Sequence, residues 1–143
     1  MIHVVVGVIF NSQGQLLVTQ RPPQKSWSGY WEFPGGKLEP GETPFQTLVR
    51  ELKEELAIEV LSAKAWSTLK YTYPEKTVFL DLWLVSRFQG TLNGLEGQAF
   101  QWVDLNNLPE LEFLPANKLI LESIKNHSLN LPDSLIDFKN SAS

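Results

Sequence analysis

The sequence predicts an α/β (α+β) sandwich with a mixed β-sheet, because strand-like apolar runs lie on both sides of one amphipathic helix and continue before a second helix. The chain has 143 residues, which suits one domain with a sizeable core. Its composition is 43% apolar and contains no Cys. This composition is typical of a compact globular domain and excludes disulfide scaffolds, thiolate metal sites and cysteine nucleophiles.

The N-terminal part is expected to form strands. Residues 2–10 are apolar and rich in β-branched side chains, which predicts a strand covered on both faces. Residues 11–14 form a turn and residues 16–21 a second short strand. Residues 21–31 are rich in Pro, Ser and Gly and form a loop long enough to carry function, and residues 33–36 close this region.

A helix is expected to begin after Thr43, the predicted N-cap. Pro44 suits the first helical position, and Gln46 lies three residues after the cap. The apolar residues that follow keep helical spacing and form one stripe that faces the core: Phe45, Leu48, Val49, Leu52 and Leu56.

The remaining expected elements are strands at 58–73, 77–88 and 100–103 and a final helix from about Pro115. This helix is expected to turn Leu119, Ile120 and Ile124 toward the core. Residues 1–127 are therefore expected to form one domain. Residues 128–143 have no clear periodicity and are expected to form a loosely attached tail.

The charge and hydropathy patterns restrict the partners and the compartment. The formal net charge of −4 argues against binding long nucleic acids by phosphate neutralisation. The apolar N-terminal segment lacks a basic region before it and a cleavage site after it, and no apolar run approaches the roughly 20 residues of a membrane-spanning helix. We therefore expect a soluble, cytoplasmic protein, most simply a monomer, that binds neither membranes nor nucleic acid.

Three carboxylates lie on the first predicted helix at positions i, i+3 and i+4: Glu51, Glu54 and Glu55. Like charges at this spacing destabilise an isolated helix, and a divalent cation would reverse that cost. The alternative is a solvated acidic face paired with Arg50 and Lys53, which is the usual meaning of a charge run.

The surrounding spacing favours the metal site. Gly36, five residues, Glu42, seven residues and then the segment 50–58 (Arg-Glu-Leu-Lys-Glu-Glu-Leu-Ala-Ile) resemble the signature box of the Nudix hydrolases. The resemblance implies an α/β/α sandwich, a Mg²⁺ cofactor that Mn²⁺ could replace, and hydrolysis of nucleoside diphosphates linked to a further moiety. Ala57 departs from the pattern, since the family usually has Gly there; a left-handed residue that ends the helix would suit that Gly.

The resemblance also assigns roles to individual residues. The implied metal ligands are Glu51, Glu54, Glu55, the Gly35 carbonyl and the loop carboxylate Glu96. The implied catalytic groups are Glu51, which is a ligand or helps to activate water, Arg50, which orients it, Glu42, which supports the site, and Lys37, which meets phosphate oxygens. From the sequence alone, an isolated loop Glu such as Glu96 is more often a solvated surface residue.

The similarity to MutT-type 8-oxo-dGTP diphosphatases extends over roughly residues 2–126, including 31–37, 94–98 and 113–117. It implies hydrolysis of 8-oxo-dGTP to 8-oxo-dGMP and pyrophosphate, which prevents mutation by sanitising the nucleotide pool. The residues implied to bind substrate are Arg21, Phe33 through its backbone, Gly36, Lys76 and Asn117. An Asn amide has a donor and an acceptor that can read a guanine edge, although Asn at a helix start is often only a cap. Lys76 stands where the subfamily pattern has Arg.

Two other functions remain open at this stage. The first is a Nudix pyrophosphatase for CTP or modified dCTP, since such relatives share the box but tend to have Asp where Asn117 stands. The second is a nucleotide-sensing Nudix module without turnover, whose expected mark is loss of the box carboxylates. That mark is not seen here.

Overall fold

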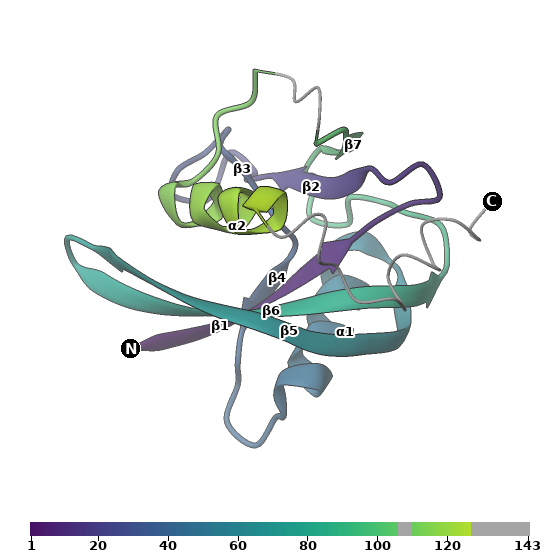
Figure 1. The fold of residues 1–143 in the computed structure, drawn as a ribbon, viewed down its shortest axis with the longest axis horizontal. Coiled ribbons are helices and arrows are strands. Elements are labelled where there is room, and N and C mark those ends of the chain that lie inside the picture. Colours follow the sequence, from purple (N-terminus) through teal and green to yellow (C-terminus); the bar gives the residue numbers. More distant parts are fainter. Residues whose placement is uncertain (106–109, 127–143) are drawn as a thin grey trace.

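The computed structural model describes residues 1–105 and 110–126. Figure 1 labels its elements, which are, in chain order, β1 (Ile2–Ile9), β2 (Leu16–Gln20), β3 (Trp31–Glu32), β4 (Gly35–Lys37), α1 (Pro44–Leu56), β5 (Glu59–Tyr73), β6 (Lys76–Gln89), β7 (Phe100–Val103) and α2 (Pro115–Asn126). The predicted tail at 128–143 lies outside the described residues. No helix in the described ranges is long and apolar enough to cross a membrane.

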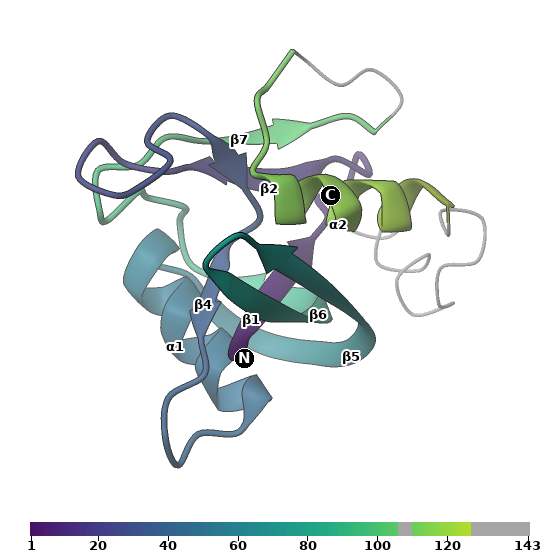
Figure 2. The same cartoon turned by 90° about the vertical axis from the view of Figure 1, so that its left-hand side faces the viewer.

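The strands form two sheets. A four-stranded sheet has the order β4-β1-β6-β5, and a three-stranded antiparallel sheet has the order β3-β2-β7. The first sheet is mixed, because β1 pairs with β6 in parallel and with β4 in antiparallel orientation. The predicted mixed sheet is confirmed, whereas the division into two sheets was not predicted. Figure 2 shows α1 and α2 on opposite sides of β1 and β6, which gives the sandwich.

Strand β1 contributes to the cores on both faces of its sheet. Val6 and Val8 belong to the core that includes α2 and the three-stranded sheet, and Val5 and Ile9 belong to the core under α1. All four side chains are buried, so the predicted strand with two covered faces is confirmed. This placement sets β4, which pairs with β1, beside the helix that carries the carboxylates.

Helix α1 begins as the sequence predicts. Thr43 accepts a hydrogen bond from the Gln46 N–H at 3.2 Å, and the Gln46 side chain accepts one from the Thr43 N–H at 2.9 Å, which forms a capping box. Leu48, Leu52 and Leu56 are fully buried against the sheet. In α2 the prediction is partly wrong: Ile120 and Ile124 are buried, but Leu119 is only half-buried, and Ala116 and Asn117 face inward instead.

Helix α1 ends at Ala57, which has φ 61° and ψ 25° and is therefore left-handed. A Cβ atom disfavours this conformation by about 1 kcal/mol relative to Gly. We expect Ala57→Gly to raise the free energy of unfolding by about 1 kcal/mol, as measured by urea denaturation. Ala63→Gly in β5, where φ is not positive, is the matched control and is expected to lower it. A loss of stability in both variants would contradict the prediction.

Candidate active site

The box carboxylates lie on the last two turns of α1, beside β4. Leu52 and Leu56 hold this part of the helix against the sheet, which fixes the direction of the polar side chains between them. Glu51 is mostly buried, with 18% of its side chain exposed, whereas Glu54 is 56% exposed. The three glutamates therefore do not share one environment. Glu51 belongs to the interior of the site and Glu54 to its rim.

Arg50 connects the two sides of the box. Its Nε and Nη2 atoms donate to both carboxylate oxygens of Glu42 at 2.6 and 3.0 Å, and its Nη1 donates to Glu51 Oε1 at 2.8 Å. Nη2 also donates to the Lys37 carbonyl at 3.2 Å, and Glu54 Oε2 lies 3.4 Å from Nη1. A planar guanidinium fixes several oxygens at once, so Arg50 orients Glu51 relative to the loop before the helix.

Glu42 anchors this arrangement. It accepts hydrogen bonds from Arg50, from the Thr47 hydroxyl at 2.8 Å and from the Glu39 N–H at 3.2 Å. These bonds, Arg50 first, lower the pKa of Glu42 to about 2, although partial desolvation opposes them. Thr47 is fully buried, and sequence analysis gave it no role.

The lowered pKa of Glu42 predicts a pH dependence. Because the folded pKa is about 2 and the unfolded value is 4.5, ionised Glu42 stabilises the fold above pH 4.5, and this contribution is lost as the pH falls toward 2. We expect Glu42→Gln to be less stable than wild type at pH 7, with the difference shrinking between pH 5 and pH 2. Urea unfolding across this range measures it, and a difference that does not change with pH would contradict the assignment.

Two glycines allow the carboxylates to approach β4. The Gly35 N–H donates to Glu55 Oε2 at 3.1 Å. A Cβ atom on Gly36 would lie 2.2 Å from the carboxyl carbon of Glu51. Any residue other than glycine at position 36 would therefore displace this carboxylate. Gly35 has φ 151°, and a Cβ there would lie 2.0 Å from the Val5 carbonyl oxygen. The glycine pair therefore sets the distance between strand and helix.

Partial burial and mutual repulsion disfavour the ionised forms of the half-buried carboxylates. Burial, followed by the charges of Glu51 and Glu32, raises the pKa of Glu55 to about 9. Burial also raises the pKa of Glu51, against the attraction of Arg50. In the described part of the chain, no three acidic or His side chains are gathered tightly enough to enclose a metal ion as they stand. The donor set nevertheless fits a hard divalent cation, which prefers oxygen ligands and would relieve this repulsion.

Glu96 is brought to the same site by the loop between β6 and β7. The Leu95 N–H donates to the Glu55 carbonyl oxygen at 3.0 Å, at the end of α1. Glu96 is close enough that its charge contributes to the raised pKa values of Glu51 and Glu55. Its carboxylate also lies 3.6 Å from Lys25 Nζ. Glu96, which is isolated in the sequence, is thus near enough to Glu51 and Glu55 to interact with them electrostatically.

Asn117, near the start of α2, contacts the segment that leads into β4. Its Oδ1 accepts a hydrogen bond from the Phe33 N–H at 2.9 Å, and only 8% of Asn117 is exposed. Asn117 is the third residue of α2, so interpreting it as the helix cap is wrong. Arg21 donates from Nε to the Ser26 carbonyl at 2.7 Å and from Nη1 to Glu32 at 3.2 Å, which fixes the loop after β2.

Glu32 is a site residue that sequence analysis missed. Burial raises its pKa, although the charge of Arg21 opposes this, and its own charge raises the pKa of Glu55. Glu32 directly precedes the segment whose Phe33 N–H binds Asn117 and whose Gly35 N–H binds Glu55. The available signal was a lone carboxylate between two aromatic residues, Trp31 and Phe33.

Lys76 stands apart from the other predicted residues. It lies at the hairpin between β5 and β6, and its Nζ is 5.8 Å from the centre of the Tyr73 ring. The Tyr73 hydroxyl accepts a hydrogen bond from the Ala116 N–H at 3.3 Å. Tyr73 thus contacts both Lys76 and the start of α2. Among the residues that the structure describes, no hydrogen bond joins Lys76 to Asn117.

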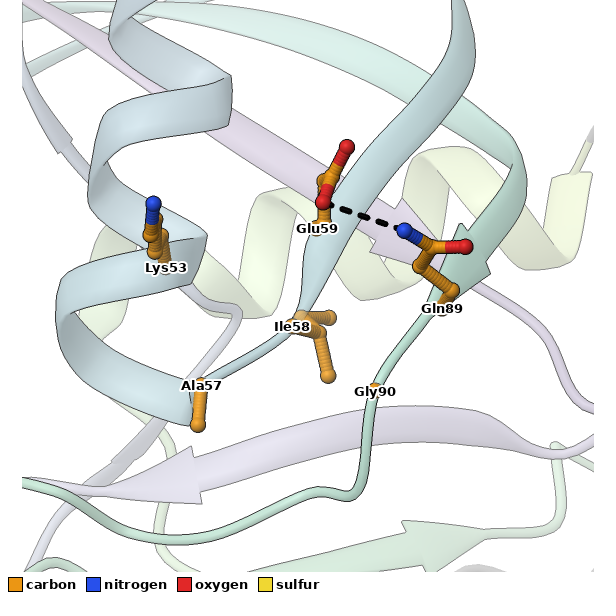
Figure 3. Close-up of a pocket in the computed structure, with 6 residues that line it drawn as sticks. All are labelled: Lys53, Ala57, Ile58, Glu59, Gln89 and Gly90. Atoms are coloured by element: carbon orange, nitrogen blue, oxygen red, sulfur yellow. Dashed lines mark hydrogen bonds between the residues drawn. The ribbon is translucent and has the colours of Figure 1, made fainter.

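A shallow pocket lies beside the C-terminal end of α1, between this end and the start of β5. Lys53, Ala57, Glu59, Gln89 and neighbouring residues line it, and Figure 3 shows Gln89 turned toward Glu59. The box carboxylates do not line this pocket, so it is separate from the site described above.

Comparison with known proteins agrees with this geometry. The family model described as the NUDIX domain matches residues 5–123. The chain is 37% identical to the 8-oxo-dGTP diphosphatase of Escherichia coli (strain K12), over 87% of this chain and 96% of that protein. It is 38% identical to the CTP pyrophosphohydrolase of the same organism, over 83% and 88%.

A solved structure gives the same result. In a study of MutT from Aliivibrio salmonicida and Vibrio cholerae, a chain with 38% identity superposes with a TM-score of 0.74, over 88% of this chain and 98% of that chain. The family match covers most of the chain and contains the whole carboxylate helix. The chain therefore belongs to the Nudix hydrolase family.

Proposed function

We propose that this chain is a divalent-metal-dependent nucleoside triphosphate pyrophosphohydrolase that acts on 8-oxo-dGTP. The observation that carries the proposal is the double attachment of one short segment. The Phe33 N–H binds Asn117, and two residues later the Gly35 N–H binds Glu55. A side chain suited to reading a base and one suited to holding a metal are thus fixed to the same stretch of backbone.

The proposed metal ligands are Glu51, Glu54, Glu55, Glu96 and the Gly35 carbonyl. When bound, Mg²⁺, or Mn²⁺ in its place, supplies charge neutralisation of the triphosphate and a lower pKa for water. Glu51, oriented by Arg50, accepts the proton of the attacking water. Lys37, at the end of β4, binds phosphate oxygens, and Glu42 keeps Arg50 in place.

The proposed reaction breaks one phosphoanhydride bond. The water oxygen bonds to the β-phosphorus, and the bond from that phosphorus to the oxygen shared with the α-phosphate breaks. The products are 8-oxo-dGMP and pyrophosphate.

Removal of 8-oxo-dGTP from the nucleotide pool keeps oxidised guanine out of DNA. Rescue of a bacterial strain with a high rate of A·T to C·G mutation would test this role, and failure at normal expression would contradict it.

Substrate binding is assigned to Arg21, the Phe33 backbone, Gly36, Lys76 and Asn117. Of these, Asn117, Arg21 and the Phe33 backbone are proposed to contact the base. We expect Asn117→Ala to raise the KM for 8-oxo-dGTP about tenfold or more, because it removes a buried hydrogen-bonding group. Asn117→Asp is the informative partner, since it keeps an oxygen for the Phe33 N–H but lacks the amide donor. Steady-state kinetics measure both variants. An unchanged KM in both would exclude a base contact.

A second candidate is hydrolysis of CTP or modified dCTP, because the similarity to a CTP pyrophosphohydrolase is comparable. The deciding experiment compares kcat/KM for 8-oxo-dGTP, dGTP, CTP and 5-methyl-dCTP at sub-saturating concentrations. Equal or higher efficiency on a pyrimidine would overturn the proposed substrate. Absence of turnover on all four would favour the non-catalytic sensor.

The proposal extends to the state of the protein in the cell. We propose a cytoplasmic monomer whose catalytic domain is residues 1–127 and whose partners are small nucleotides. The net charge of −4 supports small nucleotides, and not long nucleic acids, as the partners, since long nucleic acids are bound through positive charge.

A further inference from the structure

We infer that Gln98 is a positioning residue that holds the backbone of Glu96 at the end of α1 and so determines where the Glu96 carboxylate is presented. Gln98 was assigned no role from the sequence. It lies just before β7, is only 8% exposed, and has a polar amide where a buried residue would otherwise be apolar. The inference rests on the proposed function, because it assigns Gln98 to the proposed metal site.

Both ends of the Gln98 amide are used. Nε2 donates to the Glu55 carbonyl oxygen at 3.2 Å, and Oε1 accepts from the Glu96 N–H at 2.9 Å. One side chain therefore joins the backbone of a helix residue to that of a loop residue 41 positions later in the chain (96 minus 55). Buried amides whose donor and acceptor are both satisfied fix local geometry, because each alternative leaves a polar group unpaired.

The Glu96 carboxylate lies 3.6 Å from Lys25 Nζ, and the other backbone attachments of the loop do not involve Glu96. The Asn93 N–H donates to the Leu56 carbonyl at 3.1 Å and the Leu95 N–H to the Glu55 carbonyl at 3.0 Å, so the loop satisfies carbonyls at the end of α1. Only Gln98, among the hydrogen bonds of the described residues, restrains the Glu96 N–H. Loss of this amide should leave the loop attached and free the orientation of Glu96.

The backbone around Gln98 is built for close packing. A Cβ atom on Gly94 would lie 2.1 Å from the Gln98 carbonyl oxygen and 3.4 Å from its Oε1. The Gly97 N–H donates to the Gly94 carbonyl at 3.0 Å, and Gly97 has φ 81°, so the turn that presents Glu96 depends on these glycines. The short turn and the buried amide together determine where the carboxylate of Glu96 is presented.

The test is Gln98→Met, which keeps the length of the side chain and removes both hydrogen bonds. We expect the Kd of the free protein for Mn²⁺, measured by electron paramagnetic resonance without nucleotide, to rise about tenfold. Gln98→Glu keeps an acceptor for the Glu96 N–H but cannot donate to the Glu55 carbonyl when ionised; a smaller rise is expected. In steady-state kinetics, excess metal should restore kcat of Gln98→Met.

Gln89→Met is the matched control, because Gln89 is exposed and donates to Glu59, which is not one of the proposed metal ligands (Figure 3). It should leave the Kd for Mn²⁺ unchanged. A lower melting temperature of Gln98→Met with an unchanged Kd would overturn the inference and leave Gln98 a purely structural residue. If wild-type protein binds no Mn²⁺, the proposed function itself fails, which is a separate outcome.

Discussion

Replacing Glu55 by Gln is expected to lower metal-supported hydrolysis by about 10³-fold while leaving the metal-free protein at least as stable as wild type. Desolvation of the half-buried Glu55, followed by the like charges of Glu51 and Glu32, disfavours its ionised form. A neutral amide of the same shape removes the free-energy cost of protonating this carboxyl group on folding and keeps an oxygen for the Gly35 N–H. The same change removes one of the charges on which metal binding depends.

Two measurements separate these effects. Pyrophosphate release at several Mg²⁺ concentrations gives the loss of activity, and urea unfolding with and without Mg²⁺ gives the stability. Mg²⁺ should stabilise the wild type and not Glu55→Gln. Glu59→Gln is the control, since Glu59 is an exposed carboxylate on β5. If Glu55→Gln is strongly destabilised without metal, the interpretation of Glu55 as a repelled carboxylate is wrong.

Replacing Gly36 by Ala is expected to reduce kcat about 100-fold with little change in the free energy of unfolding. The added Cβ would lie 2.2 Å from the carboxyl carbon of Glu51 and 2.5 Å from both of its oxygens. These atoms end a flexible side chain, and Gly36 is not among the glycines with positive φ, so the fold can accommodate Ala by moving the carboxylate. A misplacement of about 1 Å in a catalytic group is enough for a loss of this size.

Gly35→Ala provides the contrast. Its Cβ would meet the Val5 carbonyl at 2.0 Å, and Gly35 has φ 151°, so this variant should lose stability. Thermal unfolding and kcat are measured on both variants. Gly36→Ala with full activity would show that the position of Glu51 does not limit the reaction.

Elements determined by local interactions could be predicted from the sequence. The limits of α1 depend on the capping box of Thr43 and Gln46 and on the Leu stripe, all within one segment, and the helix is found at Pro44–Leu56. The cluster of Glu51, Glu54 and Glu55 follows from the same helical spacing. The left-handed end at Ala57 was predicted from the Gly that the family usually has there, and the structure has it.

Features that depend on pairing between distant segments could not be predicted in this way. The parallel pairing of β1 with β6 joins Ile2 to Val78, and the pairing of β2 with β7 joins Leu16 to Val103 in the other sheet. Asn117 binds Phe33 across 84 residues, and Gln98 binds Glu55 across 43. Hydrophobic periodicity contains no information on such contacts, because it reports which face of an element is buried and not which element covers it.

The double burial of β1 has a consequence for hydrogen exchange. In the middle of β1, residues 4–6 are paired with β4 on one edge and with β6 on the other, and the side chains of Val5 and Val6 are buried in the two different cores. No partial opening frees these amides without dissolving both cores, so they should exchange with solvent only through global unfolding. The loop at 93–98 is held by a few bonds at the end of α1 and should exchange orders of magnitude faster. The proposed nucleotide site thus includes β4, which is paired with the slowly exchanging β1, and a loop that can open while the rest of the fold stays intact.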